Sequence, residues 1–338
     1  MENKNFKVAL IGYGFSGKNI HSNLIMNTPG LDLELICDSV IQKSEKYPSV
    51  QFTTQVDDIF NNAAIDLVVV ATPNASHFAL AKAALLAGKN VIVDKPLTIT
   101  LAEATELVEV AKQQNKLLCT FQNRRFDSDF LTVQKVLAEG AIGQLRYFES
   151  NYTFFFPDVG DGWREKTGQA GTGVWYDLGA HVIDQMVLQF GEPLDGYVNF
   201  ACQRENAGCP DFFKALYIYP DFRVGLQGNL LCPAKSPRFH LNGTKGSYVK
   251  HGVEQQESRL IAGVVPGSKD WGKDPNDGVL TTYENGQLTE NVYPSVDGNY
   301  LEYYRQLREA LKGNQQPPVS FEQMLATTRV IENTKRIG

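Results

Sequence analysis

Three polar side chains in the segment 171–185, GTGVWYDLGAHVIDQ, have the spacing of one helical face. Asp177, His181 and Asp184 are separated by four and then three residues, so on a helix they project from nearly the same side. Burying two carboxylates beside an imidazole is costly unless the charges are paired, which makes this stripe a poor core face. The glycines that precede the helix and leave backbone open to close approach are Gly168, Gly171 and Gly173. The segment indicates either a proton-transfer site or a capped surface helix with one solvated histidine.

A second chemistry-bearing pattern lies near the start of the chain. The apolar run 6–12, FKVALIG, passes directly into Gly12-Tyr-Gly14-Phe-Ser-Gly17 and a helix-like segment, which is the glycine fingerprint of dinucleotide binding in its strand–turn–helix context. Gly12 permits the tight turn, Gly14 lets the backbone reach a pyrophosphate, and Gly17 allows the helix to pack closely on the strand. This pattern predicts a bound dinucleotide.

The next apolar strand, 31–38, ends in Asp38. A carboxylate at about this distance downstream of the glycines is expected to bind a ribose 2′-hydroxyl. The other residues of the turn and strand end that we expect to contact the cofactor are Tyr13, Phe15, Ser16 and Ser39.

The chain then alternates between strands and helices. Strands are predicted at 50–54, 65–72, 90–96 and 116–121, and helices at 56–63, 76–89 and 101–115. Continuous Val, Ile and Leu runs between helices are typical of a parallel sheet that is covered on both faces. We therefore predict a doubly wound, Rossmann-type dinucleotide-binding domain over residues 1–122.

Polar residues follow three of these strands, at the edge where ligands of such sheets bind. These groups are Thr72-Pro73-Asn74 with His77 nearby, Asp94-Lys95-Pro96, and Asn123-Arg124-Arg125. Pro96 restricts the backbone of Lys95 to extended conformations and so fixes its position. A lysine at a strand end is often only a solvated charge, but beside a nucleotide crevice we expect Lys95 to contact the ligands.

The composition changes after about residue 123. A helix at 129–143 leads into the aromatic, strand-like run 145–156, which contains Tyr152, and the loop that follows carries Trp163 and Arg164. Further strand-like segments are expected at 196–203, 212–220, 222–232, 237–243 and 245–252. Residues 123–298 are thus predicted to form an α+β domain for substrate binding and oligomerisation, with an open, mainly antiparallel sheet flanked by helices. Helices at 299–313 and 321–335, within about 299–338, are expected to pack back on the first domain.

Composition excludes several classes of function. The 338 residues are 43% hydrophobic and 21% charged with a net charge of −6 and no basic block, which argues against nucleic acid as a partner. No apolar run approaches the roughly 20 residues that cross a bilayer, and the N-terminus has no signal-peptide pattern. Five cysteines without a CxxC pair, and histidines without ligand spacing, favour a cytoplasmic protein with reduced thiols and no metal site.

The nucleotide fold, Lys95-Pro96 after the fifth strand and the D-x-x-x-H pattern at 177–181 together resemble the Gfo/Idh/MocA oxidoreductases, the group of glucose–fructose oxidoreductase and inositol dehydrogenase. The resemblance covers essentially the whole chain. Longer stretches are similar to the bacterial scyllo-inositol dehydrogenase branch: NRRFDSDFLT (123–132), WREKTGQAGTG (163–173), YDLGAHVIDQ (176–185) and GNYLEYY (298–304).

This resemblance implies that Lys95, Asp177 and His181 surround the reacting carbon of a cyclic polyol or sugar, which is interconverted between secondary alcohol and ketone by hydride transfer with a nicotinamide. His181 is the expected general base, Lys95 would stabilise the developing alkoxide, and Asp177 would orient the substrate or the imidazole. Asp184 would support them or serve a structural role. The residues expected to bind the substrate in addition to these three are Asn123, Arg124, Tyr152, Trp163 and Arg164.

Two departures from the family pattern bear on the cofactor site. Asp94 stands where the family has a glutamate, one methylene longer, which brings its supporting contact into question. Members that prefer NADP generally lack an acid at the position of Asp38. The charge of Asp38 would repel a 2′-phosphate, so NAD is favoured. Ser39 and Lys43 leave NADP open. The resemblance also implies a homodimer or homotetramer formed through the exposed face of the second sheet. The alternatives are a non-catalytic NAD(P)-binding sensor and a glycosidase that uses transient NAD-dependent oxidation and elimination.

Overall fold

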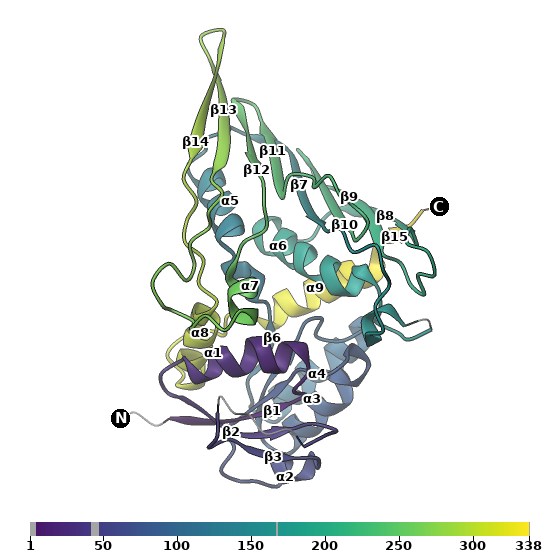
Figure 1. Cartoon of the computed structure of the whole chain (residues 1–338), viewed down its shortest axis with the longest axis vertical. Helices are drawn as coiled ribbons and strands as arrows, with labels where there is room; N and C mark the ends of the chain where they lie inside the picture. Colours follow the sequence, from purple (N-terminus) through teal and green to yellow (C-terminus); the bar gives the residue numbers. More distant parts are fainter. Residues whose placement is uncertain (1–4, 42–46, 167, 338) are drawn as a thin grey trace. The chain divides into compact units, whose positions relative to one another are not determined.

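The computed structural model of the protein describes residues 5–41, 47–166 and 168–337 (Figure 1). Its contacts divide the chain into two compact units. The first unit comprises Met1–Asn123, Gln256–Trp271 and Asn299–Thr328, and the second comprises Arg124–Gln255, Gly272–Gly298 and Arg329–Gly338. Two segments differ from the division expected from the sequence. Gln256–Trp271 belongs to the first unit and not the second, and the segment from Arg329 onward belongs to the second unit and not the first. Gln256 accepts a hydrogen bond from the backbone N–H of Tyr300 at 2.7 Å within the first unit, and Lys335–Arg336 pairs with a strand of the second.

The first unit contains a six-stranded sheet in the order β3-β2-β1-β4-β5-β6. Its strands are β1 (Phe6–Ile11), β2 (Leu31–Cys37), β3 (Gln51–Thr53), β4 (Leu67–Val70), β5 (Asn90–Asp94) and β6 (Leu118–Phe121). All neighbouring strands are parallel, as predicted for a Rossmann-type sheet. The strand order reverses between β1 and β4, and such a reversal opens the crevice in which doubly wound sheets bind nucleotides.

Helices connect and cover these strands. They are η1 (Gly17–His21), α1 (Ser22–Met26), α2 (Asp57–Phe60), η2 (Asn74–Ser76), α3 (His77–Leu86), α4 (Leu101–Gln113), α7 (Gln256–Ile261) and α8 (Leu301–Leu311). Helix α4 begins with a capping box, in which the Thr100 side chain accepts from the Glu103 N–H and Glu103 accepts from the Thr100 N–H. Helix α9 (Phe321–Asn333) starts in the first unit and ends in the second.

The second unit is built on a nine-stranded sheet in the order β14-β13-β12-β11-β7-β10-β9-β8-β15. The strands are β7 (Leu145–Thr153), β8 (Asp195–Ala201), β9 (Phe212–Ile218), β10 (Arg223–Asn229), β11 (Phe239–Gly243), β12 (Gly246–Lys250), β13 (Gly278–Glu284), β14 (Gln287–Tyr293) and β15 (Lys335–Arg336). The predicted antiparallel character is confirmed for most pairs, but β7–β10 and β8–β15 are parallel, so the sheet is mixed.

The β13–β14 hairpin, at one end of this sheet in Figure 1, is absent from the sequence prediction. Its two-residue turn is Asn285-Gly286, with φ angles of 51° and 81°. Asn-Gly is the commonest pair for such turns because both residues adopt positive φ at low cost. The sequence therefore held a signal for the hairpin.

The helix carrying Asp177 and His181 starts later than predicted and runs further. The prediction placed it at 171–185, whereas η5 (Trp175–Gly179) continues into α6 (Ala180–Phe190). Gly171 and Gly173 adopt φ angles of 79° and 80°, which a right-handed helix excludes. Aromatic contacts fix the helix on the sheet, with the Trp175 ring 5.1 Å from that of Phe213.

The remaining helices of the second unit are α5 (Ser128–Ala138), η3 (Asn123–Phe126), whose first residue belongs to the first unit, and η4 (Trp163–Glu165). Helix α5 packs on the same sheet through Phe130, whose ring lies 6.4 Å from that of Phe239. Helix α5 and the continuous helix η5–α6 thus both contact the sheet through aromatic side chains.

Candidate functional site

The glycine turn after β1 has the geometry that the fingerprint predicts. Gly12 adopts φ of 96°, and a Cβ there would lie 2.5 Å from the Ala71 carbonyl oxygen. A Cβ on Gly17 would lie 2.0 Å from the Gly12 carbonyl oxygen, so the turn closes only without these side chains. A Cβ on Gly14 would meet nothing within 4 Å. Gly14 therefore presents open backbone, which suits the approach of a pyrophosphate.

Asp38 lies directly beyond β2 and contacts this turn. Its carboxylate accepts the backbone N–H of Tyr13 at 2.6 Å and the Ser39 hydroxyl at 3.1 Å. The Tyr13 ring is buried against Phe52, whereas Phe15 is 48% exposed. Tyr13 thus contributes its backbone to the turn, and Phe15 is accessible to a ligand. Lys43, which with Ser39 left NADP open in the sequence analysis, lies outside the described residues.

The segment after β4 is held by His77. This fully buried side chain has Nε2 2.9 Å from the Thr72 carbonyl oxygen and Nδ1 2.8 Å from the Pro96 carbonyl oxygen. Burial lowers the pKa of His77, although the two carbonyl groups and the nearby carboxylate of Asp94 act in the opposite direction. His77 was expected to bind the cofactor; because it is fully buried, we assign it to the support of the two strand ends.

The other residues of this strand end differ in accessibility. Asn74 is buried and Pro73 is exposed, while Thr72 is intermediate and accepts a hydrogen bond from Ser76 at 2.7 Å. A ligand at this edge would meet Thr72 and Pro73 first.

Asp94, the shorter replacement for the family glutamate, makes a supporting contact to the lysine. It is buried at the end of β5, and its carboxylate accepts the backbone N–H of Lys95 at 2.8 Å. Burial alone would raise the pKa of this carboxyl, but His21, Ser16 and Lys95 outweigh it and hold the pKa well below its ordinary value. Asp94 is therefore a carboxylate at neutral pH. The peptide between Lys95 and the buried Pro96 is cis.

In the second unit, three of the predicted site residues meet. Arg164 donates from Nε to the Asp177 carboxylate at 3.1 Å, and its guanidinium lies 4.6 Å from the Trp163 ring centroid. The side chains of Arg164 and Asp177 are each exposed by more than a third. Asp177 lies in the first turn of the helix that carries His181, so its contact with Arg164 joins the preceding loop to that helix. The polar atoms of both side chains remain accessible to a substrate.

Asp184 serves the structural role that the sequence left open. Its two carboxylate oxygens accept hydrogen bonds of 2.7 and 2.8 Å from Nε and the terminal nitrogen of Arg125, and both side chains are buried. A paired, bidentate arrangement offsets the cost of burying the two charges. One turn earlier, His181 is 7% exposed and its ring centroid lies 6.5 Å from that of Tyr152. Asp184 thus holds the helix, and His181 lies one turn earlier on it with a small exposed fraction.

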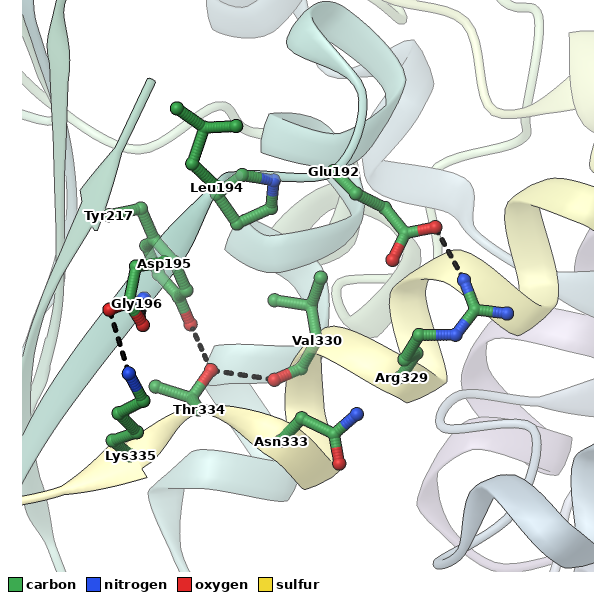
Figure 2. Close-up of a pocket in the computed structure, with 11 residues that line it drawn as sticks. Glu192, Leu194, Asp195, Gly196, Tyr217, Arg329, Val330, Asn333, Thr334 and Lys335 are labelled. Atoms are coloured by element: carbon green, nitrogen blue, oxygen red, sulfur yellow. Dashed lines mark hydrogen bonds and ion pairs between the residues drawn. The ribbon is translucent and has the colours of Figure 1, made fainter. Parts of the chain in front are cut away.

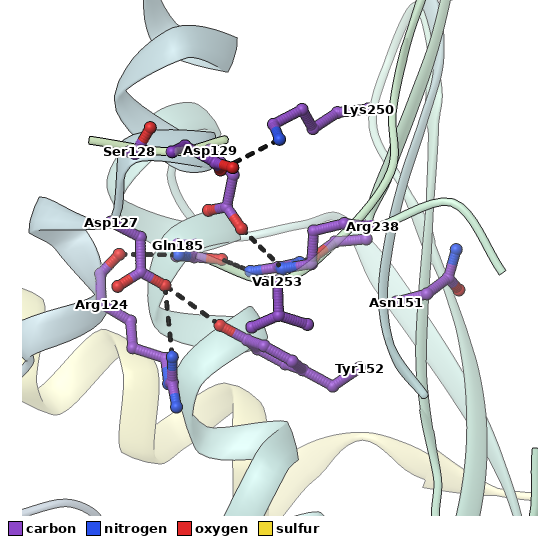
Figure 3. A network of polar contacts seen from close by, with 12 residues as sticks. Arg124, Asp127, Ser128, Asp129, Asn151, Tyr152, Gln185, Arg238, Lys250 and Val253 are labelled. Atoms are coloured by element: carbon purple, nitrogen blue, oxygen red, sulfur yellow. Dashed lines mark hydrogen bonds and ion pairs between the residues drawn. The ribbon is translucent and has the colours of Figure 1, made fainter. Parts of the chain in front are cut away.

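Tyr152, expected to bind substrate, belongs to a buried polar network (Figure 3). Its hydroxyl donates to Asp127 at 3.2 Å, which Arg124 also contacts at 3.4 Å. Burial raises the pKa of Tyr152, so it stays protonated. Asn123, also expected at the substrate, is 4% exposed, and the Arg124 side chain is 11% exposed.

Arg238 completes the network and was not identified from the sequence. It is 1% exposed, lies 3.9 Å from the Tyr152 ring centroid and forms an ion pair with Asp129 at 3.3 Å. It also donates to Gln185 on α6 at 3.1 Å. A single arginine in a strand-like segment has no spacing signal, so only the fold identifies its role.

A pocket of about 360 Å³ in the second unit contains none of the predicted residues (Figure 2). Its charged side chains pair with one another, Glu192 with Arg329 at 2.5 Å and Asp195 with Lys335 at 2.7 Å. We therefore assign it no part in the chemistry. Within residues 5–41, 47–166 and 168–337, no group of three or more His, Cys, Asp or Glu side chains could hold a metal ion. No helix in those ranges is long and apolar enough to cross a membrane.

Comparisons with known proteins match both parts of the chain to one family. The family model described as "Oxidoreductase family, NAD-binding Rossmann fold" matches residues 6–122, and its companion, "Oxidoreductase family, C-terminal alpha/beta domain", matches residues 134–336. The chain is 45% identical to the uncharacterized oxidoreductase YdgJ of Escherichia coli (strain K12), over 97% of this chain and 95% of YdgJ. It is 36% identical to the scyllo-inositol 2-dehydrogenase (NADP(+)) IolW of Bacillus subtilis (strain 168), over 96% and 92%. The solved structure of yvaA from Bacillus subtilis matches with a TM-score of 0.94 and 35% identity, over 98% and 95%.

The glycine geometry predicts opposite behaviour for two alanine variants. Gly17→Ala places a methyl group against the Gly12 carbonyl. This overpacking is expected to lower the free energy of unfolding by about 1–3 kcal/mol. Gly14→Ala meets no atom and is expected to leave stability within about 0.5 kcal/mol of wild type, while weakening the binding of the dinucleotide. Thermal unfolding and cofactor titration by fluorescence measure the two effects. Equal stability of the two variants would contradict the close approach at Gly17.

Proposed function

The chain belongs to the Gfo/Idh/MocA family of NAD(P)-binding oxidoreductases, and from that membership we propose a dehydrogenase that interconverts a secondary alcohol and a ketone on a cyclic polyol or sugar. The observation that carries the proposal is the retention of all three reactive side chains, Lys95 beyond β5 and Asp177 and His181 on one helix. The polyol class is supported by the identity with IolW, a scyllo-inositol dehydrogenase.

The first unit supplies the residues that would hold the nicotinamide dinucleotide. The open backbone at Gly14 would receive the pyrophosphate, and the Asp38 carboxylate, fixed by the Tyr13 N–H, would accept a ribose hydroxyl. Thr72 and Pro73 would contact the cofactor beyond β4. The bound nicotinamide supplies a hydride acceptor for the alcohol and a hydride donor for the ketone.

The reacting oxygen needs proton transfer and charge stabilisation, and we assign these roles to two side chains. His181 takes the hydroxyl proton of the alcohol, because an imidazole exchanges protons near neutral pH. Lys95 donates a hydrogen bond to the same oxygen and stabilises its developing negative charge. Asp177, together with Arg164 and Trp163, binds neighbouring hydroxyl groups of the substrate.

The reaction class is tested by the absorbance at 340 nm of the purified protein with NAD or NADP and a panel of inositols and aldoses. An increase with scyllo- or myo-inositol is expected. No change in absorbance with any substrate of the panel, together with measured cofactor binding, would favour a non-catalytic sensor. Cofactor that stays bound without net reduction, while a glycoside is cleaved, would favour the oxidation–elimination glycosidase.

Removing either reactive side chain should affect turnover and spare cofactor binding. His181→Ala and Lys95→Ala are each expected to lower kcat by roughly 10²–10⁴-fold, and the double variant should fall less than the product of the two losses because both act in one step. His251→Ala and Lys235→Ala, at exposed positions, are the controls. Steady-state kinetics and cofactor titration make the comparison. Full activity in either single variant would exclude that residue from the mechanism.

Asp38 is expected to set the preference for NAD. Its carboxylate would repel the 2′-phosphate of NADP, so Asp38→Ser should raise kcat/KM for NADP relative to NAD, by about tenfold for each 1.4 kcal/mol of repulsion removed. Asp32→Ser, at the start of β2, is the matched control. An unchanged cofactor ratio in Asp38→Ser would show that Asp38 does not face the ribose.

The homodimer or homotetramer and the cytoplasmic location expected from the sequence remain predictions. Exposed apolar side chains on one face of the β13–β14 hairpin support self-association. Val279 pairs across the strands with Val292, and Tyr283 pairs with Leu288. All four are more than a third exposed.

A further inference from the structure

We propose that two buried histidines, His21 and His77, position Lys95 for the reaction by holding the residues on either side of it, with Tyr304 fixing the orientation of His21. This inference rests on the proposed function only in the role given to Lys95. All of its contacts lie within the first unit.

The first contact acts on the residue before the lysine. His21 ends η1, the helical turn that begins at Gly17 of the glycine fingerprint, and its side chain is fully buried. Its Nε2 lies 3.7 Å from the Asp94 carboxylate, whose other oxygen accepts the backbone N–H of Lys95. His21 therefore faces Asp94 at a distance longer than a hydrogen bond, where its Nε2 attracts the carboxylate electrostatically, and Asp94 in turn accepts the Lys95 N–H.

The tautomer of His21 follows from its two neighbours. A neutral imidazole carries one N–H and one acceptor nitrogen. The Asp94 carboxylate accepts only, so it favours the tautomer with the proton on Nε2, and in that tautomer Nδ1 accepts from the Tyr304 hydroxyl 2.6 Å away. Burial raises the pKa of Tyr304 well above its ordinary value, which keeps the donating proton in place. The Tyr304 hydroxyl thus fixes the ring orientation through Nδ1 and leaves Nε2 facing the carboxylate.

The second contact acts on the residue after the lysine. His77 begins α3 and lies 2.8 Å from the Pro96 carbonyl oxygen through Nδ1. Its other nitrogen lies 2.9 Å from the Thr72 carbonyl oxygen beyond β4; because both neighbours are acceptors, a neutral ring donates to one carbonyl and contacts the other without a hydrogen bond. The ring therefore joins the strand end that would contact the cofactor to the turn that carries Lys95.

These histidines cannot themselves touch a substrate, since both are fully buried. Lys95 is flanked by Asp94 and Pro96, and each flanking residue is held by one of the two rings. Catalysis that relies on a placed hydrogen-bond donor is sensitive to displacements of about 1 Å, which cost up to about 10²-fold. The histidines accordingly serve as positioning residues for Lys95.

A pair of adjacent tyrosines on α8 gives a matched test. Tyr304→Phe keeps the ring and removes only the hydroxyl that orients His21. Tyr303→Phe removes an equally buried hydroxyl, which donates to the Thr120 carbonyl at 2.9 Å and lies 3.2 Å from the Cys119 sulfur. We expect kcat to fall about 10- to 100-fold in Tyr304→Phe and His77→Gln and to stay near wild type in Tyr303→Phe, with cofactor Kd unchanged in the two tyrosine variants.

The same variants in a Lys95→Ala background separate positioning from a general loss of structure. If the rings act through Lys95, Tyr304→Phe and His77→Gln should cause no further loss of kcat once the lysine is gone. Losses that multiply in that background would overturn the inference. Equal kcat in Tyr304→Phe and Tyr303→Phe would overturn it as well.

A spectroscopic measurement gives an answer even if the wild-type protein turns over no polyol, which would contradict the proposed function alone. Lysines labelled by ¹³C reductive methylation are followed by NMR, with the Lys95 resonance assigned from Lys95→Arg. A shifted Lys95 resonance in Tyr304→Phe but not in Tyr303→Phe supports the positioning role. The same resonance position in both variants rejects it.

Discussion

Charges buried away from water must find partners, and this requirement fixes the helix that carries His181. Asp184 meets Arg125 through two hydrogen bonds, and the next residue, Gln185, donates to the Arg124 carbonyl at 2.8 Å and accepts from Arg238. Removing one partner of a buried pair leaves an uncompensated charge at a cost of about 3–5 kcal/mol. These contacts therefore fix both the rotation of the helix about its axis and its position on the sheet. The orientation of the helix in turn determines where Asp177 and His181 lie.

In the first unit, a helix is fixed on its sheet by the absence of side chains and not by paired charges. At Gly12 and Gly17 the absence of side chains lets backbone meet backbone, which places the start of η1 against β1. That close approach brings His21 under the end of β5. The close packing at the glycine turn and the polar contacts of the residues around Lys95 are thus parts of one arrangement.

The sequence predicted the parallel sheet well because its strands are continuous buried runs whose pattern is local. The start of the helix after Gly173 was missed, since the positive φ of that glycine follows from its packing against Pro210 and not from the helical pattern. The partners of Asp184 and Tyr152 were equally hidden, because Arg125 lies 59 positions from Asp184 in the chain and Arg238 follows no spacing rule. Residue types indicated the chemistry, but which acids are paired and which remain accessible depends on distant parts of the chain.

The chain passes between its two units five times, after Asn123, Gln255, Trp271, Gly298 and Thr328. A protein divided in this way cannot be cut into two independently expressed halves at a single linker. Exchange of the second unit between relatives by gene fusion would require five compatible junctions, one of them inside α9. Variation in this unit is therefore expected to arise by point substitutions and not by domain shuffling.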